Sequence, residues 1–262
     1  MKPPRIVCLS TETAELCFAL GLGSQVVGRS SFCERPPAVK DVRVVSSFTE
    51  VRLERVREVA PDIVLAFSDL QAEPCQQLVK AGFPVLALNQ RTLAETLQSV
   101  RWVGGLLGVP ERAEVLVADM EARMERVRAA AAAWPVRPRV YFEEWDSPLI
   151  TGIGWVGELI TLAGGDDVFA HLSHLRSAKE RVVDPGEVIS AAPDVILASW
   201  CGKPFRDESV RARPGWDAIP AVRGGQLHAL PGAEVLSPGL SLVDGLERIH
   251  GILGAWVRDP SP

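Results

Sequence analysis

Short runs of apolar, often β-branched residues alternate with segments of helical spacing in the first third of the chain. The first run, Arg5–Leu9, predicts a buried strand, and the spacing over Glu12–Leu20 predicts a helix that ends at Gly21. Further strands are predicted at Val26–Gly28, Val42–Val45, Ile63–Ala66 and Val85–Leu88, and further helices at Leu53–Val59 and Glu73–Ala81. Strands that alternate with helices in this way are typical of a parallel α/β sheet.

Two long helical patterns occupy the middle of the chain, over Leu93–Leu107 and Glu111–Ala133. Pro110 precedes the second pattern at the first helical position, which proline tolerates. At about 1.5 Å per residue the second helix spans roughly 35 Å, which makes it a stiff connector. We therefore predict an N-terminal α/β lobe over residues 1–109, a connecting helix over 110–134 and a C-terminal α/β lobe over 135–262.

The alternation then resumes, and one motif returns. Strands are predicted at Arg139–Phe142, Val195–Leu197 and Gln226–Ala229, with a helix that opens at Glu158 and another over Leu242–Trp256. Residues 54–68 (ERVREVAPDIVLAFS) and 186–200 (GEVISAAPDVILASW) each predict the end of a helix, an Ala-Pro-Asp turn and a buried strand. A motif that recurs half a chain later indicates two similar lobes, and two lobes commonly enclose a cleft for a small molecule.

Composition narrows the class of protein. With 262 residues, 47% of them hydrophobic, the chain can bury a large core, and a net charge of −5 without a Lys/Arg-rich run argues against nucleic-acid binding. No run approaches the roughly 18 apolar residues of a membrane span. Residues 1–16 lack the apolar segment of a signal peptide, so we expect a cytoplasmic protein, or an extracytoplasmic (periplasmic) one whose export signal has been removed. The five cysteines have no CxxC spacing, which favours a reducing compartment, and Cys8 and Cys17 are expected to be buried.

In open α/β sheets, ligands bind outside the carboxyl ends of the strands, and this rule selects a short set of residues. The candidates for ligand binding are Ser10, Thr11, Ser31, Phe32, Phe48, Phe67, Ser68, Glu144, Trp145, Trp155, Trp200, Cys201 and Glu234. Three of them are tryptophans, which offer flat apolar faces and an N–H donor. One alternative is that each tryptophan closes the core of its own lobe, but we favour a shared aromatic cleft. Cys201 either touches a metal of the ligand or is a packing cysteine, and the second role is the commoner one.

Motifs for catalysis are weak or absent. Gly152–Gly157 matches the GxGxxG pattern of dinucleotide binding, but about seven residues separate it from the predicted strand, and Trp155 stands where a phosphate would approach. The HxxH at residues 171–174 has no partner pair at zinc-like spacing, so a solvated loop is expected. Glu143 and Glu144 are neighbours on a strand and point to opposite faces, which excludes them as a catalytic pair. We therefore expect no enzyme, no metal site and no cofactor.

Several segments, taken together, resemble a known family. They are RIVCLSTETAEL at the start, VVSSFTEVRLERVREVAPDIVLAFSD with Glu73 after it, the long helix, GELITLAGG, PGEVISAAPDVILASW, RPGWDAIPAVRGGQLHAL and LSPGLSLVDGLERI. In this order and spacing they resemble the periplasmic substrate-binding proteins of ATP-driven uptake systems for vitamin B12 and iron–siderophore complexes. The resemblance covers nearly the whole chain, and the cobalamin-binding members are the most similar.

The resemblance implies a class III architecture, in which two α/β lobes with parallel sheets are joined by a single long helix and hold the ligand in a cleft without chemistry. It places Phe48 and Phe67 of the first lobe, and Trp200 of the second, against a corrin-like ligand. Glu73 matches an acidic residue that pairs with arginines of the membrane transporter in this family. Glu208 is the candidate for the equivalent residue of the second lobe.

The function implied is that of a monomer that binds cobalamin or another corrinoid and delivers it to an ABC importer. Cobalamin binders of the family carry an Asp and an Arg in the loop before the last Ser-Pro, and Gly232–Leu236 lacks both. An iron–siderophore or haem ligand is therefore an alternative. A nucleotide-cofactor oxidoreductase that uses Gly152–Gly157 is the alternative of a different class.

Overall fold

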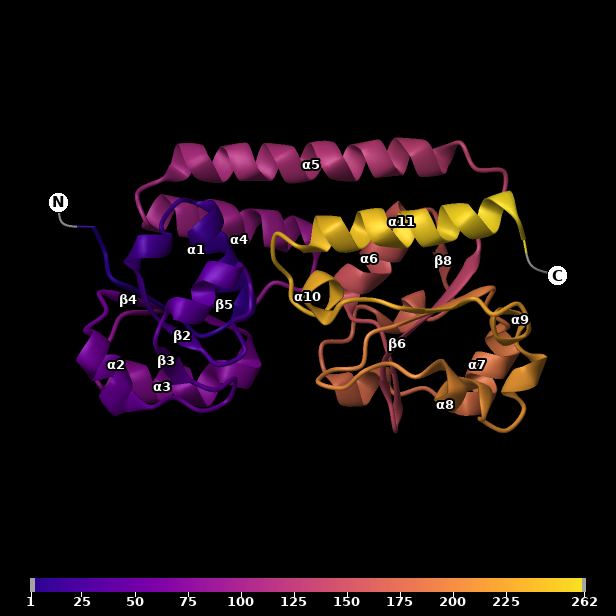
Figure 1. The fold of residues 1–262 in the computed structure, drawn as a ribbon, viewed down its shortest axis with the longest axis horizontal. Helices are drawn as coiled ribbons and strands as arrows, with labels where there is room; N and C mark the ends of the chain where they lie inside the picture. The colour runs from indigo at the N-terminus through magenta and orange to yellow at the C-terminus, as the bar shows by residue number, and fades with distance from the viewer. Residues whose placement is uncertain (1–2, 261–262) are drawn as a thin grey trace. The chain divides into compact units, whose positions relative to one another are not determined.

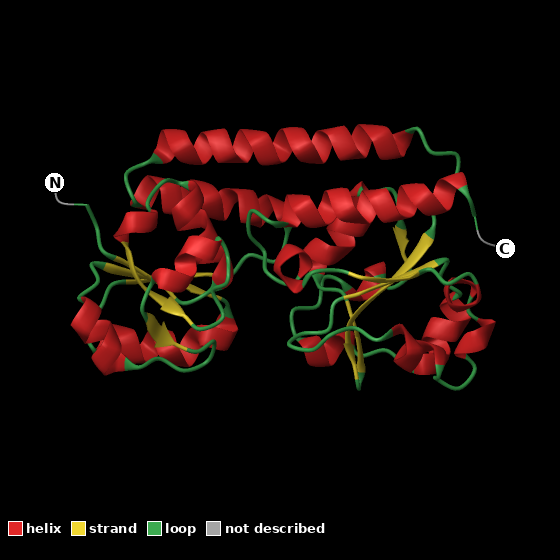
Figure 2. Cartoon of the chain, viewed as in Figure 1, coloured by secondary structure: helices red, strands yellow, loops and turns green. Residues whose placement is uncertain are grey.

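The computed structural model describes residues 3–260 and divides the chain into two compact units (Figure 1). The first comprises the residues up to Gln90 together with Ala94–Met120, and the second comprises Arg91–Leu93 together with the residues from Glu121 onward. The division falls inside helix α5 (Pro110–Ala132), the long helix that the sequence predicts over 110–134. Each unit contains strands and helices (Figure 2), and the predicted class of fold, two α/β units, is confirmed.

The sheet of the first unit has five parallel strands. In spatial order they are β3 (Val44–Ser46), β2 (Val26–Ser30), β1 (Ile6–Cys8), β4 (Ile63–Phe67) and β5 (Val85–Leu88). The helices of this region are α1 (Thr11–Ala19), α2 (Leu53–Val59), α3 (Ala72–Lys80) and α4 (Leu93–Leu106). Val7 of β1 and Val64 of β4 pack in one core with Val56 of α2 and Leu78 of α3. The central strand β1 is buried along its whole length, which explains why it contains no polar residue.

The first Ala-Pro-Asp turn joins α2 to β4 and also holds the start of β1. Ala60 ends α2 in the left-handed conformation, with φ of 40°. Asp62 accepts a hydrogen bond from the backbone N–H of Arg5 (2.7 Å), and the Arg5 guanidinium donates to the carbonyl of Val59 (2.8 Å). The turn therefore ties the end of a helix to the beginning of the neighbouring strand.

The second turn repeats this arrangement in the other unit. Ala192 ends α7 (Pro185–Ala191) with φ of 43°. Asp194 accepts from the backbone N–H of Arg139 (2.8 Å), and the Arg139 guanidinium donates to the carbonyl of Ala191 (2.7 Å). The similarity of the two halves thus extends from the motif to an arginine that lies far from it in the sequence.

The sheet of the second unit is mixed. Its strands are, in spatial order, β10 (Leu227–Ala229), β9 (Val195–Ala198), β6 (Arg139–Asp146) and β7 (Leu149–Thr151), and β8 (Asp166–Asp167) also pairs with β6. Every pair is parallel except β6–β7. The expectation of a wholly parallel sheet is therefore wrong at this edge, where β6 continues four residues beyond its predicted end and turns back into β7.

The helices of the second unit surround a core rich in aromatic side chains. They are α6 (Gly154–Leu162), α7, α8 (Asp207–Arg211), α9 (Pro220–Arg223), α10 (Gly232–Val235) and α11 (Leu242–Arg258). In the core, Phe169 and Trp216 lie edge-on to Tyr141, with ring centroids 5.6 and 6.3 Å away. Helix α6 begins four residues before the predicted start at Glu158, which changes the setting of Trp155.

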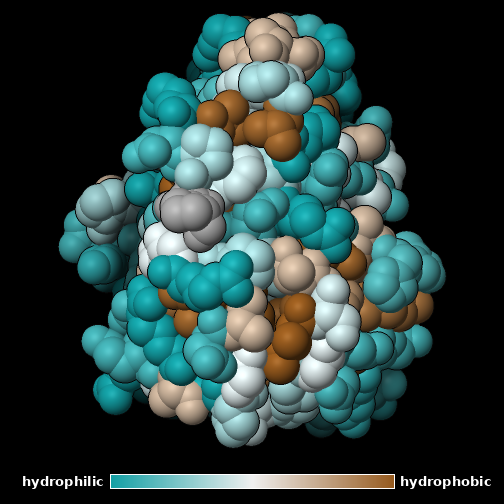
Figure 3. Space-filling view, turned by 90° about the vertical axis from the view of Figure 1, so that its right-hand side faces the viewer, coloured by the Kyte–Doolittle hydropathy of each residue, from teal (hydrophilic) through white to brown (hydrophobic). Residues whose placement is uncertain are grey.

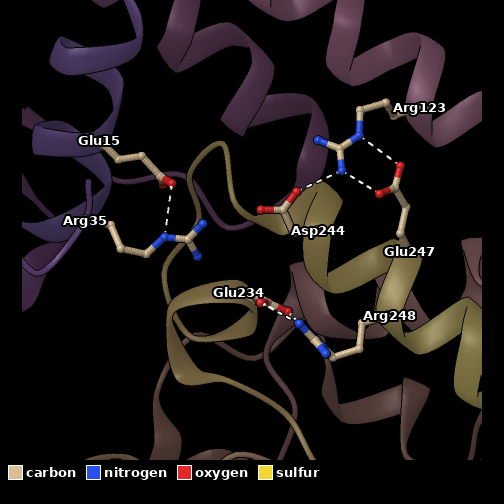
Figure 4. Close-up of polar contacts among 7 residues, drawn as sticks. All are labelled: Glu15, Arg35, Arg123, Glu234, Asp244, Glu247 and Arg248. Atoms are coloured by element: carbon tan, nitrogen blue, oxygen red, sulfur yellow. Dashed lines mark hydrogen bonds and ion pairs between the residues drawn. The ribbon is translucent and has the colours of Figure 1, made fainter. Parts of the chain in front are cut away.

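Within the second unit, the later part of α5 is fastened to α11. Arg123 donates to Asp244 (2.8 Å) and to both carboxylate oxygens of Glu247 (2.9 and 2.6 Å), as Figure 4 shows. Trp134, just after α5, stacks on His250 of α11 with centroids 4.6 Å apart. One face of α11 is buried in the core, so these contacts fix α5 to a rigid part of the unit.

Among residues 3–260, no helix combines the length and the apolar character that crossing a bilayer requires. The face shown in Figure 3 is largely hydrophilic, with hydrophobic residues in small separate groups.

Candidate functional site

Phenylalanine side chains gather at the carboxyl ends of strands in the first unit. Phe32 follows β2 and is 59% exposed, and its ring lies edge-on to that of Phe48, which follows β3, with centroids 6.2 Å apart. Thr11 opens α1 and donates its hydroxyl to the carbonyl of Phe32 (2.9 Å). Ser31 precedes Phe32 and is exposed. The structure thus brings together four predicted site residues from the ends of three strands.

The position of Phe48 depends on Gln71, which the sequence prediction missed. Gln71 is fully buried, and its amide nitrogen donates to the carbonyls of Leu9 (2.9 Å) and Phe48 (2.8 Å). Its amide oxygen accepts from the backbone N–H of Phe67 (2.9 Å). A single side chain therefore ties the ends of β1 and β4 to the loop after β3. No local pattern reveals this role, because it depends on strands that only the fold brings together.

Three other predicted ligand residues of this unit are buried. Ser10, Phe67 and Ser68 are 1%, 7% and 5% exposed. The hydroxyl of Ser10 shares a hydrogen bond with that of Thr13 (3.0 Å), and the hydroxyl of Ser68 accepts from the N–H of Leu70 (3.2 Å). These three residues therefore lie at the strand ends as predicted, but their side chains are buried and do not form part of the exposed surface.

Glu12 is a further residue of this region that the prediction did not select. It lies in the first turn of α1, is only 5% exposed, and its Oε1 has no hydrogen-bond partner in the described structure. Burial raises the pKa of this carboxyl from 4.5 to about 7, although a hydrogen bond with Ser10 acts in the opposite direction. Glu12 therefore changes its charge near neutral pH at the end of β1.

In the second unit, two indole rings enclose a lysine at the strand ends. The Nζ of Lys203 lies 4.2 Å from the ring centroid of Trp145 and 5.0 Å from that of Trp200. Trp145 belongs to β6 and Trp200 follows β9, the parallel neighbour of β6. Phe205 lies edge-on to Trp200 at 5.0 Å. An aromatic group is thus present at this edge, with a central cation that the sequence prediction missed.

Trp200 is more deeply placed than we expected. It is 6% exposed, belongs to the core of the second unit, and donates its indole N–H to Glu143 (2.9 Å). For this residue the structure supports the alternative, in which the tryptophan closes the core of its own lobe. The half-buried Trp145 and the loop that carries Lys203 and Phe205 form the more accessible part of the group.

Each of the three carboxylates near the end of β6 is paired with a cation. Arg213 makes two hydrogen bonds to the fully buried Glu143 (2.6 and 2.8 Å).

The other two pairs are formed in the same way. Arg181 makes two hydrogen bonds to Glu144 (2.8 and 3.3 Å), and Lys203 binds Asp146. Glu144, which the sequence suggested as a ligand-binding residue, is therefore held by an arginine of the protein itself. The acidic run of β6 presents little net negative charge.

Two predicted site residues lie in the interior of helical packing. Trp155 is buried in α6 and donates its indole N–H to the carbonyl of Val235 (2.8 Å), so the prediction that it lies in a loop at the site is wrong. Glu234 is 8% exposed, and both of its carboxylate oxygens bind Arg248 (2.6 and 2.9 Å; Figure 4). Both side chains join α10 to its neighbours, and neither is free to contact a ligand.

The glycines of the GxGxxG segment are explained by close packing. Strand β7 ends at Thr151, directly before the segment, so the predicted separation of about seven residues between strand and segment is wrong. However, β7 is antiparallel, and a Cβ on Gly154 would lie 2.6 Å from the carbonyl oxygen of Arg91. A Cβ on Gly157 would lie 3.2 Å from a carboxylate oxygen of Asp167. Gly154 and Gly157 therefore leave room for the Arg91 carbonyl and the Asp167 carboxylate of the protein itself. The negative charge of Asp167 disfavours a phosphate bound at this position.

The remaining predicted residues lie at the surface. Cys201 is exposed beside Trp200, and the partial burial of its thiol raises the pKa of that group. In contrast to Cys201, Cys8 and Cys17 are buried, as predicted. Glu73 is exposed on α3 and lines a pocket of about 470 Å³ with Thr49, Glu50, Val51 and Gln77. Glu208 is exposed in the first turn of α8. In the described part of the chain, no three His, Cys, Asp or Glu side chains are grouped so as to hold a metal ion.

Comparisons with known proteins add an independent observation. A family model described as "Periplasmic binding protein" matches residues 6–234. The chain is 26% identical over 172 residues to the vitamin B12-binding protein of Pectobacterium carotovorum, which covers 64% of this chain and 62% of that protein. It is also 26% identical over 257 residues to the uncharacterized ABC transporter substrate-binding lipoprotein YvrC of Bacillus subtilis, covering 95% of this chain and 79% of the relative. The match thus spans less than two thirds of the length of the first of these relatives.

Solved structures have the same fold over their whole length. The periplasmic haem-binding protein RhuT of Roseiflexus, in its apo form, superimposes with a TM-score of 0.83 at 25% identity, covering 97% of this chain and 99% of that one. The periplasmic vitamin B12-binding protein BtuF of Vibrio cholerae superimposes with a TM-score of 0.79 at 22% identity, covering 98% and 99%. At this identity, the second likeness establishes the fold alone.

Proposed function

Because the chain belongs to the periplasmic binding protein family, we propose that it is a non-catalytic substrate-binding protein that binds a large metal chelate and delivers it to an ABC importer. The family resemblance seen in the sequence is confirmed by the family model. The ligand that we propose is cobalamin or another corrinoid, because vitamin B12-binding proteins are among the relatives in sequence.

One observation carries the proposal: aromatic side chains come together at the carboxyl ends of the strands in each unit. Phe32 and Phe48 form the group in the first unit, and Trp145 and Phe205 belong to the group in the second. Exposed aromatic surface of this kind binds the flat apolar face of a macrocycle, while a few polar groups orient its edge. Thr11 and Ser31 supply such polar groups in the first unit.

An iron chelate or haem is the second candidate ligand. The loop before the last Ser-Pro, Gly232–Leu236, lacks the Asp and Arg expected for cobalamin, and its one acidic residue, Glu234, is engaged by Arg248. Haem-binding proteins are among the structures with the same fold. A nucleotide-cofactor oxidoreductase finds no support, since the packing around Gly154 and Gly157 leaves no place for a phosphate.

The importer contact is proposed to involve Glu73 and Glu208. Both are exposed, each lies in the first turn of a helix, and both are candidates to bind arginines of the membrane subunits. We place the protein outside the cytoplasmic membrane on the basis of its family and of a lipoprotein among its relatives, and we propose that it acts as a monomer.

A direct test is thermal unfolding of the protein with a panel of ligands. Hydroxocobalamin, haem and a ferric siderophore complex are compared with NAD and NADP. A ligand at 100 times its dissociation constant stabilises the folded state by about 2.7 kcal/mol, which gives a shift of a few degrees. We expect a shift with at least one chelate and none with the nucleotides. Stabilisation by NADP alone would contradict the proposal.

A further inference from the structure

The lysine between the two indole rings has unused binding capacity. Lys203 carries an ammonium group with three N–H donors, and Asp146 is the one hydrogen-bond partner described for it. Its side chain is 37% exposed. The side chain of its partner Asp146 is 21% exposed, so solvent reaches both members of the pair.

Of the three cations that neutralise the end of β6, Lys203 is the most exposed. The side chains of Arg181 and Arg213 are 2% and 17% exposed, and each makes two hydrogen bonds to one carboxylate. Those two arginines are therefore committed to the protein, whereas Lys203 can turn one or two donors outward. The rings of Trp145 and Trp200 restrict where its ammonium group can lie.

We infer that Lys203 determines ligand specificity by binding an anionic group at the edge of the chelate. The inference rests on the proposed function, because it concerns the same ligand site. A carboxylate or phosphate that reaches the ammonium group forms a charge-assisted hydrogen bond, while the apolar part of the same ligand lies on Trp145 and Phe205. The ligand class is therefore a chelate with an apolar face and at least one peripheral anion.

A purely structural role for Lys203 makes a different prediction. If the ammonium group only covers the indole rings and neutralises Asp146, its removal lowers stability and weakens all ligands alike. If it binds a ligand anion, its removal weakens only ligands that carry the anion. Pairs of ligands of which only one member carries the anion therefore separate the two roles.

The test uses two such pairs: haem with its dimethyl ester, which differs from haem only at the carboxylates, and cyanocobalamin with dicyanocobinamide, which lacks the whole nucleotide loop that carries the phosphate. Affinities for the wild type and Lys203→Gln are measured by absorbance titration. Because hydrogen bonds to charged groups contribute about 1.5–3 kcal/mol, we expect Lys203→Gln to weaken the anionic member of the binding pair about tenfold or more. Its uncharged partner should change less than about twofold, and Lys203→Arg should restore most of the difference.

Lys179→Gln, at another exposed lysine of the second unit, is the matched control and should leave all affinities unchanged. Circular dichroism and tryptophan emission verify that each variant is folded. Equal weakening of both members of a pair would overturn the inference and leave the proposed function standing. Failure of the wild type to bind any chelate would refute the proposed function, and the inference with it.

Discussion

Replacing the buried Glu12 by glutamine is expected to stabilise the protein at alkaline pH and not at acid pH. The side chain is 5% exposed, and burial raises its pKa from 4.5 to about 7. Below pH 4.5 the carboxyl is protonated in both the folded and the unfolded chain, so glutamine, a neutral isostere, changes little. As the pH rises from 4.5 to 7, the unfolded chain loses this proton and the folded chain retains it. The wild type therefore loses stability across this window, and the loss is complete above pH 7.

The size of the effect follows from the shift in pKa. At about 1.36 kcal/mol for each pKa unit, a change from 4.5 to about 7 corresponds to roughly 3 kcal/mol. We expect the free energy of unfolding of Glu12→Gln to exceed that of the wild type by roughly this amount at pH 8, and by much less at pH 5. A change of this size is a large fraction of the stability of an ordinary domain.

Urea unfolding at a series of pH values, with midpoint and slope recorded separately, measures this difference. Glu111 provides a matched control, because it occupies the same second position of helix α5 as Glu12 does in α1 but is exposed. Glu111→Gln should show no comparable dependence on pH. A gain for Glu12→Gln that is the same at pH 5 and pH 8, or a carboxyl that titrates near 4.5 by NMR, would refute the reasoning.

Four further variants test the anchors and the surface described above. Asp62→Ala and Asp194→Ala remove the hydrogen bonds that hold the starts of strands β1 and β6, respectively. Each should lower the free energy of unfolding by about 1–2 kcal/mol in chemical denaturation. Gln71→Leu removes the side-chain hydrogen bonds made to three backbone groups, two of these bonds being buried, so it should cost about 2–4 kcal/mol and speed amide hydrogen exchange at Phe67; slow exchange there would contradict the anchoring role. Phe32→Ala removes an exposed ring, so it should weaken chelate binding about tenfold while leaving the melting temperature nearly unchanged.

Local patterns predicted the elements of the first unit well because its strands are short and largely buried, and because α-helices separate most of them. The run at Ile6–Cys8 is covered on both faces, so its apolar character identifies it without knowledge of its neighbours. The repeated motif was equally informative, since helix end, turn and strand are all specified within fifteen residues. Its partner Arg5 could not be recognised, because the hydrogen bonds to Asp62 and Val59 join residues more than fifty positions apart.

Prediction failed where structure depends on pairing between distant segments. Strand β7 has three residues and forms through its antiparallel pairing with β6, to which a bridge from Ile150 to Val182 is added. Helix α6 consequently starts at Gly154, directly after this strand, and Trp155 is carried into the interior. Lys203 offers no motif of its own, and its importance arises from two rings whose residues stand far apart in the sequence.

The two copies of the Ala-Pro-Asp motif differ at the end of the strand that follows, where the aromatic residue is held by a neutral group in one unit and by a charged group in the other. At the end of β4, Phe67 is held by the neutral amide of Gln71. At the end of β9, Trp200 is held by Glu143, which is itself paired with Arg213.

The anchor of the first unit is neutral, whereas an ionic anchor places the second unit's aromatic group among paired charges. Lys203 is the most exposed member of those pairs. A ligand with one apolar face and one anionic edge matches this difference between the units. The common part of the motif therefore builds each sheet, and the residues just beyond it give each unit a distinct surface for the ligand.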